Sequence, residues 1–161
     1  MESGEVNIAL SMPATQSSTY ENPDIYGATF ATDGLVPKLQ YGYLCTHTRG
    51  EFTPWLSIDL QDMFKIKKVV LVNRQDENDS FRFLKLFLFA GQRLHDVEVR
   101  AGLDGVSFPG ICGTFVGPGF TGQSVNILCQ KKTIGRFVRA QIVKGGPEYL
   151  TLCEMEIYTD K

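Results

Sequence analysis

The chain has 161 residues, which is enough for one folded unit with a complete hydrophobic core. Charged residues make up 21% of it and the net charge is −2, so the composition offers no electrostatic basis for binding nucleic acid or an anionic membrane. No apolar run approaches the ~20 residues that span a bilayer, so we expect no membrane insertion.

The first forty residues combine one short apolar run with a long polar segment. We expect a strand at residues 7–10, followed by an ordered loop rich in Ser, Thr, Pro and Gly. Within this loop, Asp33 and Gly34 mark a tight turn. Long ordered loops of this kind commonly carry binding groups over a rigid scaffold.

From residue 55 onwards the pattern changes to that of short strands. Apolar and polar residues alternate in 137–143 and 155–158, which is typical of half-buried antiparallel strands. We predict separate strands at 55–60 and 66–72, lying side by side, and further strands at 97–101, 125–128, 137–143 and 151–158. No helical periodicity is long enough for a core helix. The sequence therefore predicts an all-β, antiparallel β-sandwich of the jelly-roll type, with residues 1–161 as a single domain.

One segment interrupts this pattern. Residues 81–89, FRFLKLFLF, are apolar except for Arg82 and Lys85 and show little alternation. A strand buried on both faces or packed under a loop is the favoured interpretation. A self-associating edge and an inserted run foreign to the mature fold remain as alternatives.

The four cysteines indicate the cellular compartment of the protein. Cys45, Cys112, Cys129 and Cys153 are even in number and widely spaced, with no C-x-x-C pair that would indicate zinc or redox chemistry. This set favours two disulfides in a secreted, extracellular protein, although the start, MESGEV, lacks the features of a signal peptide. Three pairings are possible, and the spacing does not choose among them.

Stretches along nearly the whole chain resemble the F-type lectins, or fucolectins, typified by the eel fucose-binding agglutinin. They occur in the order of that family and read ATQSS, FATDG, CTHT, PWLSIDL, KKVVLVNRQD, RLHDVEVRAG, GRFVRAQI and LTLCEMEIY. The resemblance implies a galactose-binding-like, discoidin-related sandwich that binds L-fucose.

The sugar motif of the family is a histidine, a spacer of about 26 residues, Arg-x-Asp and a further basic residue. His47 and Arg74 enclose 26 residues here, and Asp76 completes the triplet. The resemblance implies that His47 and Arg74 hold sugar hydroxyls. Asp76 would orient Arg74 through a charge-assisted hydrogen bond.

The last basic residue of the motif departs from the pattern, because Phe81 stands at its usual position. Arg82 is one step further on, but Arg93 fits better by its context before DVEVRAG. Choosing Arg93 implies an insertion at about residues 79–90. A second departure is Glu77-Asn78, which stands where many members have adjacent cysteines that stack on the sugar.

An apolar wall should meet the methyl group of fucose, with Tyr20, Tyr41 and Tyr43 as candidates. The resemblance further implies the disulfides Cys45–Cys153 and Cys112–Cys129. It also implies a structural Ca²⁺ that pins the loop at residues 20–45. Its ligands would be the carboxylates of Asp33 and Glu154 and the carbonyl oxygens of Phe30, Leu35, Leu44 and Cys153.

We therefore expect a secreted, non-catalytic, calcium-containing lectin for fucosylated glycans, acting in innate immunity or cell adhesion, with homo-oligomers providing avidity. The alternative is a discoidin-like module for protein or lipid whose sugar site the insertion at 79–90 has altered. An enzyme is not expected, since the sequence has no G-x-S-x-G elbow and no evident carboxylate pair.

Overall fold

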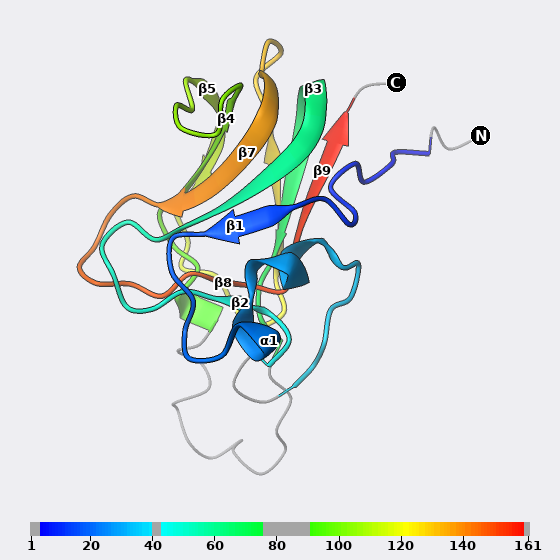
Figure 1. The fold of residues 1–161 in the computed structure, drawn as a ribbon. Helices are drawn as coiled ribbons and strands as arrows, with labels where there is room; N and C mark the ends of the chain where they lie inside the picture. The colour runs from blue at the N-terminus through cyan, green and yellow to red at the C-terminus, as the bar shows by residue number, and fades with distance from the viewer. Residues whose placement is uncertain (1–3, 40–42, 76–90, 160–161) are drawn as a thin grey trace.

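The computed structural model describes residues 4–39, 43–75 and 91–159. In these ranges the chain consists mainly of antiparallel strands arranged as a sandwich, with short helical turns at one end (Figure 1). The strands are β1 (Ala14–Gln16), β2 (Thr46–His47), β3 (Trp55–Val72), β4 (Val97–Gly102), β5 (Gly110–Phe115), β6 (Ser124–Leu128), β7 (Ile134–Ile142), β8 (Thr151–Leu152) and β9 (Glu154–Thr159). The predicted all-β, antiparallel sandwich is confirmed.

Strand β3 belongs to both layers of the sandwich. Its first half pairs with β1 and β7, and its second half, up to Val72, pairs with β6 and β9. The register with β7 shifts between Asp59 and Phe64, where Gln61 has a φ of 64°. The prediction of two separate strands side by side at 55–60 and 66–72 is wrong, because a bulge lets one strand continue through the polar residues between them.

The core lies between the two layers. Val97 and Val99 of β4, and Val138 and Ala140 of β7, are fully buried, while the residues between them are half-buried. This is the alternation expected of strands with one face on the core. Burying each valine stabilises the fold by about 1.5–3 kcal/mol relative to leaving it exposed.

The N-terminal strand predicted at residues 7–10 is wrong. Asn7 forms only an isolated bridge to Tyr158, and a turn follows it. Its side-chain oxygen accepts hydrogen bonds from the backbone N–H groups of Ala9 and Ile157, both at 3.0 Å. A side chain that bonds the backbone locally competes with ladder pairing, which explains the turn.

Three strands, β1, β2 and β5, lie where no strand was predicted, and β2 pairs with β8. β1 falls within the polar loop, and β5 contains two glycines beside Cys112, so neither has a strong strand signature. Both are held by neighbouring strands: β1 pairs with β3, and β5 pairs with β4. The strand predicted at 151–158 is divided at Cys153 into β8 and β9.

Both disulfides implied by the family resemblance are present. Cys45–Cys153 joins the residue before β2 to the junction of β8 and β9, and Cys112–Cys129 joins β5 to the end of β6. The first closes a separation of 108 residues and the second one of 17. By loop entropy they stabilise the fold by roughly 4–5 and ~3 kcal/mol.

The helical elements are short and lie at one end of the sandwich. They are α1 (Pro23–Tyr26) and a 3₁₀ helix, η1 (Ala28–Thr32). Asn22 caps α1 by accepting a hydrogen bond from the Asp24 N–H, and Pro23 suits the first helical position. Among the described residues, no helix has the length and apolarity needed to cross a bilayer.

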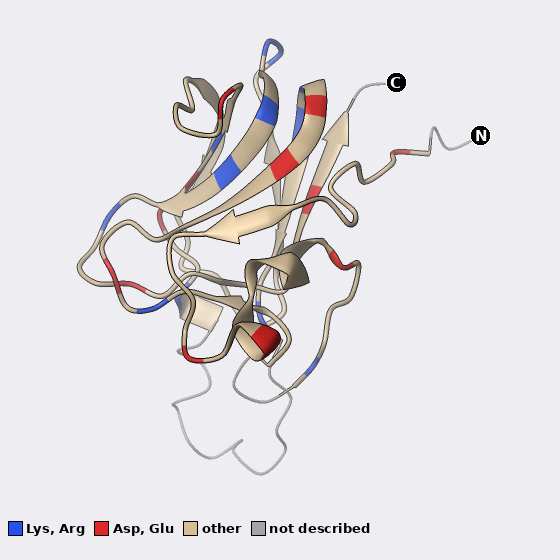
Figure 2. Ribbon diagram, viewed as in Figure 1, with Lys and Arg blue, Asp and Glu red and all other residues tan. Residues whose placement is uncertain are grey.

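Acidic and basic residues are interspersed on the strands (Figure 2). On β7, Arg136 donates two hydrogen bonds to Asp59 of β3, at 2.7 and 2.8 Å. The guanidinium lowers the pKa of the Asp59 carboxyl below its ordinary value. This pair joins two strands of one layer and does not line the pocket described next.

Candidate functional site

A pocket of about 370 Å³ opens near α1, β2 and the residues that follow β3. Its lining combines charged side chains with tyrosine rings. Its lining residues are Tyr20, Glu21, Tyr26, Tyr43, His47, Arg74, Arg93 and Tyr149. They come from segments far apart in the sequence, so only the folded chain creates this pocket.

His47 at the end of β2 is 5% exposed, and both of its ring nitrogens have partners. Nδ1 lies 2.7 Å from the carbonyl oxygen of Thr48, which can only accept a hydrogen bond. Nε2 lies 3.4 Å from Nη1 of Arg93, which can only donate. These partners suit the tautomer with its proton on Nδ1, in which the lone pair of Nε2 faces Arg93 at the pocket.

Arg93 is held by two aromatic residues in addition to its own segment. Its guanidinium carbon lies 4.7 Å from the centre of the Tyr149 ring, a cation–π contact, and Nη1 donates to His47. A guanidinium carries five N–H donors in a planar fork, a geometry that suits adjacent oxygens of a ligand. The structure thus places Arg93 beside His47 in the pocket.

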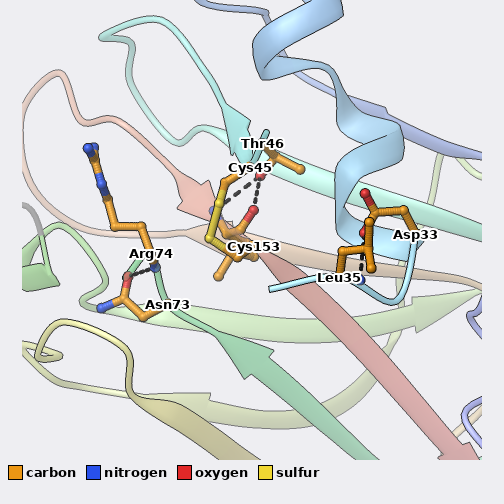
Figure 3. Close-up of a disulfide and its surroundings, with 8 residues drawn as sticks. Asp33, Leu35, Cys45, Thr46, Asn73, Arg74 and Cys153 are labelled. Carbon is orange, nitrogen blue, oxygen red and sulfur yellow. Dashed lines mark hydrogen bonds between the residues drawn. A yellow bond between two sulfur atoms is a disulfide. The ribbon is translucent and has the colours of Figure 1, made fainter. Parts of the chain in front are cut away.

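Arg74 is the second residue after the end of β3 and is only 4% exposed. Its backbone N–H donates to the side-chain oxygen of Asn73 at 3.0 Å (Figure 3), and its carbonyl accepts from the Gly122 N–H at 2.8 Å. Charged side chains are seldom so deeply buried unless they are paired or functional. A fixed backbone therefore presents this charge to the pocket.

Tyrosines form the side walls of the pocket. The Tyr20 ring stacks on His47 with 4.6 Å between ring centres, while Tyr26 and Tyr149 meet the imidazole edge-on at 5.2 and 5.6 Å. Burial raises the pKa of Tyr26, so its phenol is neutral at physiological pH. The walls are therefore apolar ring faces that carry hydroxyl groups.

The structure brings together His47, Arg74, Arg93, Tyr20 and Tyr43, all of which were predicted from the sequence. Tyr41, Asp76 and Arg82, and the insertion at 79–90, lie outside the described residues. The sequence analysis missed three lining residues, Glu21, Tyr26 and Tyr149. An aromatic residue in a Gly/Pro-rich loop was the available signal for Tyr149, because binding groups concentrate on such loops.

The residues suggested for calcium also lie close together. Glu154 of β9 is 1% exposed, its Oε1 accepts from the Gly34 N–H at 2.9 Å, and its buried Oε2 has no partner among the described residues. Burial, followed by the nearby Asp33 carboxyl, raises the pKa of Glu154 to about 9. A buried carboxylate with a second carboxyl group beside it is what a bound cation would stabilise.

The remaining suggested ligands are backbone carbonyls on neighbouring segments. Phe30 lies on η1, and Leu35 donates its N–H to Asp33 at 2.9 Å. Leu44 precedes the disulfide Cys45–Cys153, and in the view of Figure 3 this disulfide lies between Arg74 and Asp33. Among the described residues, no three His, Cys, Asp or Glu side chains are arranged to hold a metal ion, so carbonyl oxygens would have to complete the coordination.

A second histidine, His95, contacts residues next to the pocket. His95 lies two residues after Arg93, with Nδ1 3.0 Å from Asp96 and Nε2 3.3 Å from Glu148, the residue before Tyr149. Lys144 approaches Asp96 at 3.9 Å. Burial lowers the pKa of His95, but the hydrogen bonds to Asp96 and Glu148 outweigh it and leave this pKa raised.

The contacts of His95 with Asp96 and Glu148 predict that the stability of the fold depends on pH. Because the folded pKa of His95 is raised, its stabilisation is complete below the ordinary value near 6.5 and is lost as pH rises through the folded value. His95→Gln should therefore lower the free energy of unfolding by about 1 kcal/mol at pH 5.5 and by clearly less at pH 8.5. Urea denaturation at both pH values measures this difference.

Arg136→Gln is the matched control for this experiment. It breaks the pair with Asp59, whose lowered pKa keeps that carboxylate charged at both pH values. Its effect on unfolding should therefore be the same at pH 5.5 and 8.5. Equal effects of His95→Gln at the two pH values would show that the imidazolium makes no such contribution.

Comparison with known proteins gives a consistent match. Residues 30–140 match the family described as the NedA-like, galactose-binding domain. The chain is 32% identical to Fucolectin-6 of Anguilla japonica over 154 residues, covering 94% of this chain and 74% of that protein.

Two solved structures are also similar. A serum f-lectin (fucolectin) from Morone saxatilis, the striped bass, has a TM-score of 0.78 and 28% identity over 97% of this chain, which spans about half (49%) of that protein. A fucose binding module from Streptococcus pneumoniae has a TM-score of 0.74 and 26% identity, covering 99% of both chains.

Proposed function

Because the chain belongs to the fucolectins, within the family of NedA-like, galactose-binding domains, we propose that it is a lectin for glycans that end in L-fucose. The observation that supports this most strongly is the convergence of His47, Arg74 and Arg93 in one tyrosine-lined pocket. Their identity and spacing match the motif of the family, except for the displaced third basic residue.

The chemistry of the pocket suits a sugar hydroxyl. A hydroxyl group donates one hydrogen bond and accepts two. It can donate to Nε2 of His47 by replacing the long 3.4 Å contact of that atom with Arg93, and it can accept from the N–H groups of the two arginines. Two guanidinium groups can hold adjacent oxygens of one ring, as on the vicinal hydroxyls of fucose.

The tyrosines suit the apolar part of the same sugar. L-Fucose carries a methyl group where galactose carries a hydroxymethyl group, and the faces of Tyr20, Tyr26 and Tyr43 offer an apolar wall for it. Asp76 is proposed to orient Arg74, and Tyr41 to extend this wall. The role of Asp76 follows from the motif of the family, and that of Tyr41 from the apolar wall that the methyl group needs.

We further propose that the protein binds sugar without modifying it. Glycoside hydrolysis requires two carboxyl groups roughly 5–10 Å apart across the scissile bond. Among the described residues, Glu21 supplies the one carboxylate that lines the pocket, and its hydrogen bond to Tyr20 raises the pKa of that phenol. This arrangement supports binding rather than acid–base catalysis.

The wider role proposed is recognition of cells or microbes outside the cell. Two disulfides favour an oxidising, secretory environment. An open, polar pocket binds one sugar with modest affinity, so we propose that homo-oligomers supply avidity on fucosylated surfaces. Innate immunity or cell adhesion would use such multivalent recognition.

A structural Ca²⁺ is proposed beside the pocket rather than in it. The residues fit the ion: Asp33 and Glu154 provide two carboxylates, one of whose oxygens is buried without a partner. Carbonyl oxygens of Phe30, Leu35, Leu44 and Cys153 would complete the six to eight oxygens that Ca²⁺ takes. When bound, the ion would hold η1 and the segment before β2 against β9.

A glycan array with matched fucosylated and non-fucosylated glycans tests the proposed function. We expect the protein to bind structures with terminal L-fucose and to be displaced by free L-fucose. Binding to lipid vesicles or to protein, with no response to fucose, would contradict the proposal and favour a discoidin-like module instead.

A further inference from the structure

Asn73 is completely buried although its side chain is a polar amide. Such a side chain is strongly unfavourable in the interior unless each polar group finds a partner. The Oδ1 of Asn73 accepts from the Arg74 N–H at 3.0 Å, and its Nδ2 donates to the carbonyls of Gly91 at 2.8 Å and Phe120 at 2.9 Å. Both polar atoms of the amide therefore have hydrogen-bond partners.

These hydrogen bonds join three segments that are distant in the sequence. Arg74 follows β3, Gly91 lies two residues before Arg93, and Phe120 belongs to the connection between β5 and β6. The backbone N–H of Asn73 also donates to Gln123 on that connection, at 2.9 Å. One side chain thus links the backbones that carry both arginines of the pocket.

The segment that leads to Arg93 is closely fitted to this link. Leu94 donates its N–H to the Gly91 carbonyl at 3.3 Å and accepts from the Gly119 N–H at 2.8 Å. A Cβ at Gly91 would lie 2.4 Å from the backbone nitrogen of Thr121. The two backbones therefore approach as closely as glycine permits, and the Asn73 amide fixes their separation.

We infer that Asn73 is a positioning residue that sets the distance between the guanidinium groups of Arg74 and Arg93, and hence the affinity for adjacent sugar hydroxyls. This inference rests on the proposed function for its ligand. Asn73 does not line the pocket and acts through the arginines. Of the residues this small, only asparagine offers two donors and an acceptor on one rigid group.

The substitution Asn73→Asp tests the hydrogen bonds of Asn73 separately from the shape of its side chain. Aspartate keeps the size of the side chain and its acceptor for the Arg74 N–H, but it loses both donors to Gly91 and Phe120. We expect the affinity for L-fucose, measured by calorimetry, to fall at least about tenfold, since binding groups must be held within roughly 0.5 Å of their productive positions.

Gly119→Ala provides a milder variant if Asn73→Asp does not fold. A Cβ at Gly119 would lie 3.2 Å from Nδ2 of Asn73 and would crowd the same amide without removing a hydrogen-bonding group. The expected loss of affinity is roughly threefold. Thr133→Val is the control, because it removes a buried hydrogen bond to Ile111 that does not involve the pocket.

Nuclear magnetic resonance of the Arg93 side chain supplies a readout that does not depend on fucose. The Tyr149 ring should shift the Arg93 Nε–Hε signal, and this shift should shrink in Asn73→Asp and stay unchanged in Thr133→Val. A shrinking shift without any fucose binding by the native protein would retain the positioning role and refute the proposed ligand. Native fucose affinity and an unchanged Arg93 signal in folded Asn73 variants would overturn the inference.

Discussion

Replacing Arg74 with alanine should weaken binding of L-fucose about 100-fold while leaving the strands of the sandwich intact. The side chain is buried in the pocket, on a backbone fixed by hydrogen bonds to Asn73 and Gly122. Hydrogen bonds from charged donors contribute about 1.5–3 kcal/mol each, and 100-fold corresponds to about 2.7 kcal/mol. Isothermal titration with L-fucose measures this loss, and His47→Ala should lose about tenfold or more.

Arg136→Ala is the matched control for Arg74→Ala. It also removes a guanidinium from the folded chain, but one that pairs with Asp59 on the strands and does not line the pocket. Its fucose affinity should equal that of the native protein. If Arg74→Ala folds normally and binds fucose as well as this control does, the pocket described above is not the sugar site.

Adding Ca²⁺ should raise the midpoint of thermal unfolding by about 5–10 °C relative to protein in EDTA, and Glu154→Gln should abolish this shift. A ligand at 100 times its dissociation constant stabilises the native state by about 2.7 kcal/mol, and each kcal/mol moves the midpoint by ~2–4 °C at this chain length. Differential scanning calorimetry at neutral pH measures both proteins with and without the ion.

The same variant should behave in the opposite way without calcium. The pKa of Glu154 is raised to about 9, so its contribution to the stability of the ion-free protein is complete below the ordinary carboxyl value near 4.5 and is lost as pH rises towards 9. A neutral glutamine removes this loss, and Glu154→Gln in EDTA should be more stable than the native protein at pH 8.

Glu156→Gln serves as control because it lies on the same strand, with its carboxylate bonded to the Tyr158 hydroxyl at 2.7 Å. It should keep the calcium-induced shift. If calcium stabilises Glu154→Gln and the native protein equally, the proposed metal site is refuted.

The choice of Arg93 over Arg82 shows the limit of predicting a binding site from residue spacing. The text around Arg93 pointed to it, and the structure places its guanidinium on Tyr149 and beside His47. Neither arginine stands at the usual position of the motif. A motif is defined by sequence spacing, whereas the pocket depends on which segments the fold brings together. Asp76 and Arg82 lie outside the described residues, so their roles stay predictions.

The class of fold and the residues of the proposed sugar motif could be predicted from residue type and order alone. Alternation along a strand is local, so it revealed the buried face of β7, and the fixed interval from His47 to Arg74 could be read directly. The pairing of the cysteines, and the proposed role of Asp33 and Glu154 as calcium ligands, likewise followed from the resemblance to a family. Each of these depends on residue type and order.

Features that depend on long-range contacts are visible only in the folded chain. It showed that β3 is one bent strand shared by two layers, that Tyr26 and Tyr149 complete the walls of the pocket, and that the Asn73 amide joins the segments of both arginines. Contacts between residues tens of positions apart leave no periodic trace in a single sequence. Their physical cause is the shared burial of polar groups that must find partners, which exists only in the folded chain.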